Sequence, residues 1–149
     1  MKRFVALSTV TFMTLGLWGS NSTFAASSTV RLTAHLKGSN EVSKKGPVRG
    51  RGTAVVRINL TKNQLCYTLA VSGFKLPAVA AHIHSGGAGK EGPIVVPFPT
   101  FPGSTGRAAG CTTARASLLK GIANHPASYY VNVHTAAYPG GAVRGQLGM

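Results

Sequence analysis

Apolar and polar side chains alternate along much of the chain after residue 28, which is the pattern of half-buried β-strands. In residues 29–37 every second residue is Val, Leu or Ala, and the residues between them are Thr, Arg, His and Lys. Similar runs predict short strands at residues 29–37, 52–60, 64–72, 79–84, 93–98, 128–135 and 142–147. Residues 115–123 predict one short helix. About seven strands with frequent turn signals favour an all-β fold, an antiparallel Greek-key sandwich or small barrel.

The first 25 residues have the layout of a secretory signal peptide. Lys2 and Arg3 precede a mainly apolar run over residues 4–18, and the small residues Thr23 and Ala25 stand at the −3 and −1 positions of a cleavage site. We predict cleavage after Ala25, which leaves residues 26–149 as one domain, secreted or periplasmic, without a transmembrane span. The alternative is an uncleaved anchor, for which the apolar run is short and rich in Ser and Thr.

The two cysteines, Cys66 and Cys111, both lie in the predicted mature domain. An exported protein with an even number of cysteines usually pairs them, so we predict a disulfide. A metal-binding thiolate pair and two free thiols are the alternatives. The Cys-x-x-Cys spacing that favours a metal is absent.

Acidic residues are almost missing from the chain. It has 16 Lys and Arg but only 2 acids, for a formal net charge of +14, and both acids, Glu41 and Glu91, are glutamates. A Ser-His-Asp triad is therefore excluded, and so are calcium loops and magnesium-dependent phosphoryl transfer, which need several carboxylates. A glycosidase pair would require Glu41 and Glu91 to meet. A site in this chain must use His, Cys, Tyr, Asn, Arg or backbone groups.

A basic patch is expected around Lys44, Lys45, Arg49 and Arg51. An acidic protein, an anionic cell-surface polymer or anionic lipid headgroups at a membrane surface are the partners that such charge would favour. Nucleic acid is not expected, because the protein is predicted to be exported and shows no aromatic stacking platform. The alternative is a solvated basic surface without a specific partner.

The candidate chemistry is carried by histidines. Alternation places Val79, Ala81 and Ile83 on one face of their strand, so His82 and His84 share the opposite face. If the later strands are neighbours, the same face also collects Tyr130, Asn132, His134 and Arg144. Three neutral imidazoles suit copper or zinc, so His82, His84 and His134 are candidate metal ligands. The other three are candidate surrounding or anion-binding residues. The alternative is an ordinary polar outer face of a sandwich.

Three motifs in order resemble the CHRD (chordin) domain family. They are AHIHSG at residues 81–86 with GPIVV at 92–96, NHP with YYVNVHT over 124–135, and YPGGAVRGQL at 138–147. The likeness extends over residues 30–147 and implies an exported β-sandwich module without an established enzymatic activity or an agreed catalytic set. Ala142 departs from the pattern, because family members often carry an acid there.

A weaker likeness links the His-x-His strand and the distant His134 to the copper site of copper/zinc superoxide dismutases. Arg144 would take the anion-guiding part in such a site. The zinc site of those enzymes needs an Asp, and this chain has none, so the full two-metal site is excluded and a site for copper alone stays compatible with the likeness. The expected sandwich is accordingly immunoglobulin-like or superoxide-dismutase-like.

Two function hypotheses follow from these observations. The first is a non-enzymatic binding or envelope module, without catalytic residues, that recognises a protein or an anionic polymer. The second is a copper or zinc protein that uses His82, His84 and His134, with superoxide-related activity as one form of it.

Overall fold

The structure is a computed structural model that describes residues 29–42 and 46–149. Its strands are β1 (Thr29–Lys37), β2 (Arg51–Asn59), β3 (Gln64–Ser72), β4 (Ala78–Ser85), β5 (Ile94–Pro97), β6 (Arg107–Thr113), β7 (Tyr129–Thr135) and β8 (Tyr138–Gly148). The helices are α1 (Ala116–Asn124) and the 3-10 turns η1 (Gly38–Asn40) and η2 (Pro126–Ser128). The predicted signal peptide lies outside the described residues. Within them, no helix has the length and apolar character needed to cross a membrane.

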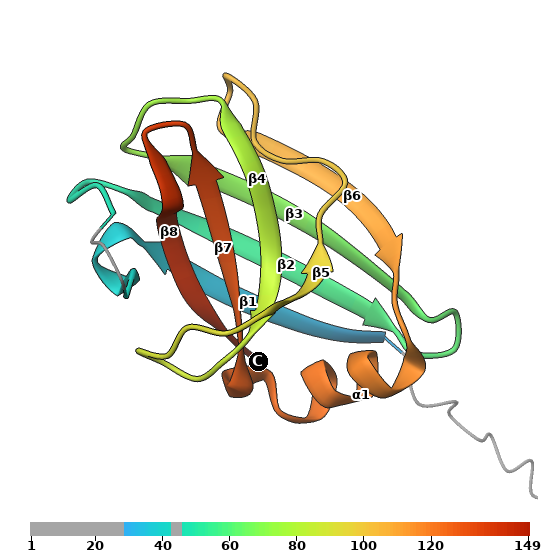
Figure 1. Cartoon of the computed structure of the whole chain (residues 1–149). Coiled ribbons are helices and arrows are strands. Elements are labelled where there is room, and N and C mark those ends of the chain that lie inside the picture. Colours follow the sequence, from blue (N-terminus) through green and yellow to red (C-terminus); the bar gives the residue numbers. More distant parts are fainter. Residues whose placement is uncertain (1–28, 43–45) are drawn as a thin grey trace, which may run out of the picture.

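All strands belong to one antiparallel sheet in the order β5-β4-β7-β8-β1-β2-β3-β6. The sheet is strongly curled, so that the half made of β5, β4, β7 and β8 lies across the half made of β1, β2, β3 and β6 (Figure 1). Strands twist with one hand, and a sheet of this width therefore curls instead of lying flat. The predicted all-β, antiparallel class with one short helix is confirmed, with the two layers formed by one continuous sheet.

The core fills the space between the two halves of the sheet. Every second side chain of β1, β2 and β3 points into it, as the alternation predicts. Leu32, Val56 and Leu65 are examples that are completely buried. Helix α1 lies at one end of the curled sheet (Figure 1) and contributes Leu119 and Ile122 to the same core.

Strand β6 was not predicted, and its sequence explains why. Its residues, RAAGCTT, are small or polar, and none of its side chains is fully buried. It nevertheless pairs with β3 along its whole length, with Cys66 directly opposite Cys111. The two cysteines form the predicted disulfide. Cross-strand pairing and a covalent bond hold this edge strand, so it needs no apolar face of its own.

Val79 does not share the buried face of Ala81 and Ile83, on which alternation placed it. Val79 is 51% exposed, whereas its neighbour Ala78 is buried. The pairing of β4 with β7 shifts by a bulge between Ala78 and Ala80, and a one-residue insertion reverses the faces on either side of it. From Ala81 onward the predicted alternation holds, and this later part of β4 carries the two histidines.

Candidate metal centre

Strands β4, β7 and β8 are hydrogen-bonded neighbours, as the histidine hypothesis required. Their register places the polar residues in two rows across the outer face of this half of the sheet. The first row is His82, Asn132 and Arg144, and the second is His84, Tyr130 and Gln146. His134 follows Asn132 by two residues on β7, so it points to the same face. Regular alternation therefore brings all the candidate residues onto one surface.

The three histidine rings form one cluster. The ring centroids are 5.5 Å apart for His82 and His84, 5.1 Å for His82 and His134, and 6.3 Å for His84 and His134. One potential ligand nitrogen from each ring lies within 4.8 Å of the others. Ligand bonds of about 2 Å hold donor atoms about 3–4 Å apart, so small side-chain rotations suffice to bring the three nitrogens onto one ion.

Backbone carbonyls fix the orientation of two of the rings. Nδ1 of His84 lies 2.9 Å from the carbonyl oxygen of Gly92, and Nδ1 of His134 lies 2.9 Å from that of Pro139. A carbonyl only accepts, so in the neutral rings Nδ1 donates the hydrogen and Nε2 keeps its lone pair. Carbonyl-oriented rings with a free Nε2 are the arrangement that metal-binding histidines commonly adopt.

One nitrogen of each histidine ring has no hydrogen-bond partner among the described residues. Nε2 of His84, Nε2 of His134 and Nδ1 of His82 are buried and make no hydrogen bond among the described residues. A buried polar atom without a partner costs free energy. The cluster therefore buries one nitrogen of each ring that no described protein group satisfies, and in His84 and His134 this nitrogen is an acceptor.

The surroundings keep the three rings neutral. Burial, reinforced by repulsion from His134 and His84, lowers the pKa of His82 to about 4. Burial also lowers the pKa of His84, and the charges of His134 and Arg144 act in the same direction against the opposing bond to Gly92. The pKa of His134 is lowered by burial, against the opposing bond to Pro139. Neutral imidazole is the form that binds a metal, so protons do not compete for this cluster near pH 7.

The histidine cluster offers imidazole nitrogens as ligands, and the two cysteines do not add to it. The cysteines are joined to each other in the disulfide between β3 and β6, so neither offers a thiolate. A neutral set of three imidazoles suits Cu(II) and Zn(II), and does not suit the hard ions Mg²⁺ and Ca²⁺.

Arg144 was expected to face outward from the last strand, but it is only 2% exposed. The loop between β4 and β5 covers it. Its Nη2 donates to the carbonyl oxygens of Gly87 and Lys90 at 2.9 and 2.6 Å, and its Cζ lies 3.4 Å from the centroid of the Tyr130 ring. The ring of His84 stacks on Tyr130 with 4.8 Å between centroids. Arg144 therefore holds the loop in place and packs on Tyr130, whose ring stacks against the candidate ligand His84.

Glu41 is a site residue that the sequence did not reveal. It follows η1, is buried, and accepts bonds from Nδ2 of Asn132 at 3.1 and 3.3 Å. Its carboxylate packs against Gly141, where a Cβ would collide with it, and the φ of +136° at Gly141 also favours glycine. Glu41 lies in a loop remote in sequence from Asn132, so no local pattern signals the contact.

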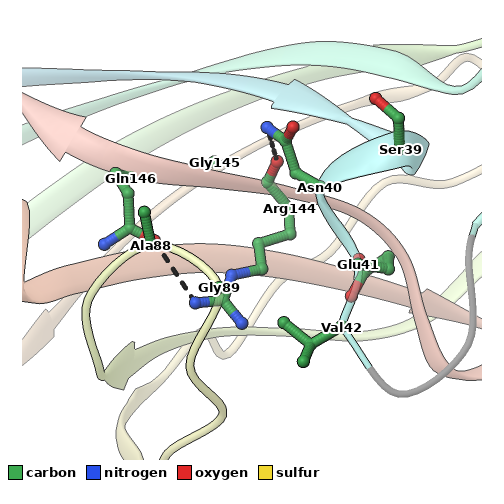
Figure 2. A pocket seen from close by; sticks show the side chains of 9 residues that line it. All are labelled: Ser39, Asn40, Glu41, Val42, Ala88, Gly89, Arg144, Gly145 and Gln146. Carbon is green, nitrogen blue, oxygen red and sulfur yellow. Dashed lines mark hydrogen bonds between the residues drawn. The ribbon is translucent and has the colours of Figure 1, made fainter.

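A pocket of about 420 Å³ opens beside this network, between η1 and the loop that follows β4 (Figure 2). Figure 2 shows the Arg144 side chain reaching between the Ala88–Gly89 turn and Glu41. Asn40 closes another side by donating to the Arg144 carbonyl at 3.1 Å. The pocket has both polar and apolar lining residues, and one of them, Arg144, packs on the Tyr130 ring that stacks against His84.

No described residue of the predicted basic patch belongs to the histidine cluster. Arg49 and Arg51 are exposed at the start of β2, and Lys44 and Lys45 lie outside the described residues.

The fold and the cluster together define an all-β module that carries three histidines on the outer face of one half of its sheet. The model of one protein family, the CHRD domain, matches residues 32–147. The chain therefore belongs to the CHRD domain family, as the three motifs indicated. No curated protein and no solved structure matches the chain.

Proposed function

We propose that this CHRD-domain protein binds one transition-metal ion through His82, His84 and His134. The observation that carries the proposal is a cluster of three histidines, each of which offers a ring nitrogen within 4.8 Å of the others and buries a nitrogen that has no hydrogen-bond partner among the described residues. An ion accepting all three lone pairs would remove the cost of burying them, and the lowered pKa values keep the rings in the binding form. The alternative of an ordinary polar outer face does not account for buried, unpartnered atoms.

Copper is the ion that the donor set favours. Imidazole accommodates both copper and zinc, and among divalent ions of this series Cu(II) binds a given nitrogen site most tightly. We assign Tyr130, Asn132 and Arg144 to positioning the ligands, since Arg144 is engaged by the loop carbonyls. An anion-guiding role for Arg144 has no support from these contacts.

Export is part of the proposal. The basic start, apolar run and small-residue cleavage site of residues 1–25 support it, and so does the disulfide, which is typical of oxidising compartments. N-terminal sequencing of the protein recovered outside the cytoplasm is expected to begin at Ala26, and a start at Met1 would contradict the proposed cleavage.

Metal binding is tested by titrating the metal-free protein with Cu(II) and recording electron paramagnetic resonance spectra. One equivalent is expected to give a nitrogen-coordinated signal, and Cu(II) at a hundred times its Kd should stabilise the fold by about 2.7 kcal/mol. His82→Ala and His134→Ala should each abolish the signal. His35→Ala and His125→Ala are matched controls, because both rings are exposed and lie outside the cluster.

Two results would overturn the proposal. One is the absence of Cu(II) or Zn(II) binding tighter than about 1 µM, which corresponds to about 8 kcal/mol. The other is an equal loss of the signal in the control variants, which would place the copper on exposed histidines. Circular dichroism of each variant establishes that the fold is retained.

A further inference from the structure

A second cluster of chemically similar side chains lies around an open hollow of about 260 Å³ between the end of β1 and the start of β2. Its lining consists of Lys37, Ser39, Val48, Arg49, Gly50 and Arg51. All the charged side chains that line it are basic, and the side chains of Lys37, Arg49 and Arg51 are exposed. The hollow thus concentrates positive charge in a concave part of the surface, where counter-ions are attracted most strongly.

The sheet register forces these charges together. Lys37 stands directly opposite Arg51 on β2 and directly opposite Arg144 on β8. Like charges in directly opposed positions destabilise a sheet. The carboxylate of Glu41, the nearest acid along the chain, is buried against Asn132 and does not line the hollow. Lys37 and Arg51, which both line the hollow, therefore have no carboxylate beside them within its lining.

The backbone around the hollow is pinned in place. The Gly50 N–H donates to the Pro47 carbonyl at 2.8 Å, and the Gly38 N–H donates to the Gly50 carbonyl at 3.0 Å. Nε of Arg51 donates to the Arg49 carbonyl at 3.2 Å, which orients its guanidinium. Gly73 has a φ of +85°, and its missing Cβ leaves room for the Arg49 carbonyl to approach closely. The basic side chains therefore project from a preorganised turn, which lowers the cost of binding.

We propose that this hollow binds a phosphate-type oxyanion through Lys37, Arg49 and Arg51. Guanidinium groups present planar pairs of donors that match the oxygens of such an anion, and lysine adds a point charge. The anion would neutralise the opposed cations that the sheet holds together. The site is independent of the histidine cluster, so the two proposals can fail separately.

The test is a titration of metal-free, ¹⁵N-labelled protein with inorganic phosphate at constant ionic strength. Saturable shifts are expected at the amides of residues 37–39 and 49–51. Arg51→Gln and Lys37→Gln should each weaken phosphate binding about threefold to tenfold, the range for losing one charged contact. Arg57→Gln is the matched control: it removes the same charge from the same strand, at a cross-strand pair with Arg31, but away from the hollow.

The proposal requires the Arg51 variant to lose more affinity than the Arg57 variant. Equal weakening in both, or shifts spread along both ends of β1 and β2, would show that phosphate responds only to net charge and would overturn it. A lack of saturable binding would do the same. Repeating the titration with polyphosphate and with phosphatidylglycerol vesicles distinguishes a polymer from a lipid as the source of the phosphate, because only the source that reaches the hollow should show the same dependence on Arg51.

Discussion

The candidate site offers a metal the ring nitrogens of three histidine side chains. The fold buries one nitrogen of each of His82, His84 and His134 without a hydrogen-bond partner among the described residues. Two of the rings are held by backbone carbonyls, so they cannot rotate to find other partners without giving up these bonds. At the scale of single residues the cluster is therefore a set of preoriented, neutral donors.

The lowered pKa of His82 predicts how stability depends on pH. In the unfolded chain His82 binds a proton below about pH 6.5, whereas in the folded protein its pKa is about 4. Between these values the unfolded state binds more protons, so the free energy of unfolding rises with pH and falls on acidification through this window. Urea unfolding of the metal-free protein at about pH 7 and about pH 4.5 measures the difference.

His82→Gln should make this pH dependence shallower, because it removes the group that resists protonation. His125→Gln is the control, since that ring is exposed and lies outside the histidine cluster. Stability that does not change, or that rises, between about pH 6.5 and about pH 4 would contradict the neutral state of His82 in the folded protein.

At the scale of elements, the sequence predicted the strands most accurately where apolar and polar residues alternate regularly. Strands β1, β2 and β3 bury one face each, and their predicted bounds agree with the structure to within one residue. Strand β6 lacks large apolar residues, so alternation could not reveal it. The bulge near Val79 depends on the pairing of β4 with β7, which is a property of two distant segments. Local pattern thus predicts strands with a core face, and misses features that only pairing creates.

The same distinction holds for the candidate site. Alternation was sufficient to place His82, His84 and His134 on one face, because all three lie in regular strands. It could not predict the burial of Arg144 or the contribution of Glu41, since both depend on loops that fold over the sheet. The candidate ligands were therefore accessible from sequence, and their supporting contacts were not.

The loop between β4 and β5 is the element that supports the site, and Arg144 fastens it. Arg144→Gln should release the carbonyls of Gly87 and Lys90, and so loosen the position of Gly92, whose carbonyl orients His84. We expect faster hydrogen exchange at the amides of residues 86–92 and Cu(II) binding weakened about tenfold, the range for losing a supporting contact. Calorimetric titration and exchange mass spectrometry measure the two effects.

Arg57→Gln serves as the control for this loop variant, because Arg57 lies on the exposed face of β2 and has no contact with the loop. An Arg144→Gln protein that exchanges like the parent at residues 86–92 would show that other bonds hold the loop. The Gln146 side chain, which donates to the Gly86 carbonyl at 3.0 Å, would then be the main fastening.

At the scale of the whole molecule, the curled sheet has two halves that must stay closed over one core. The chain crosses from the half that contains the histidines to the other half after β5, and there Phe98 stacks on Tyr67 of β3 with 3.8 Å between ring centroids. The Tyr67 hydroxyl also bonds the backbone of Thr100, donating to its carbonyl at 2.7 Å and accepting from its N–H at 2.9 Å. This contact joins the two halves of the sheet on the side where the end strands, β5 and β6, are not paired with each other.

Tyr67→Phe tests whether this closure stabilises the molecule without contributing to the metal centre. The variant keeps the ring stack and removes both hydrogen bonds, leaving the Thr100 backbone groups unpaired, so the free energy of unfolding should fall by about 1–3 kcal/mol. Cu(II) affinity should stay unchanged, because the histidines face outward from the opposite half of the sheet. Tyr138→Phe is the matched control, since the Tyr138 hydroxyl makes no hydrogen bond among the described residues.

Urea unfolding measures stability, and Cu(II) titration measures affinity. If Tyr67→Phe weakened copper binding as much as stability, the two halves would act as one coupled unit, and the metal centre would depend on closure of the whole sheet and not on β4 and β7 alone.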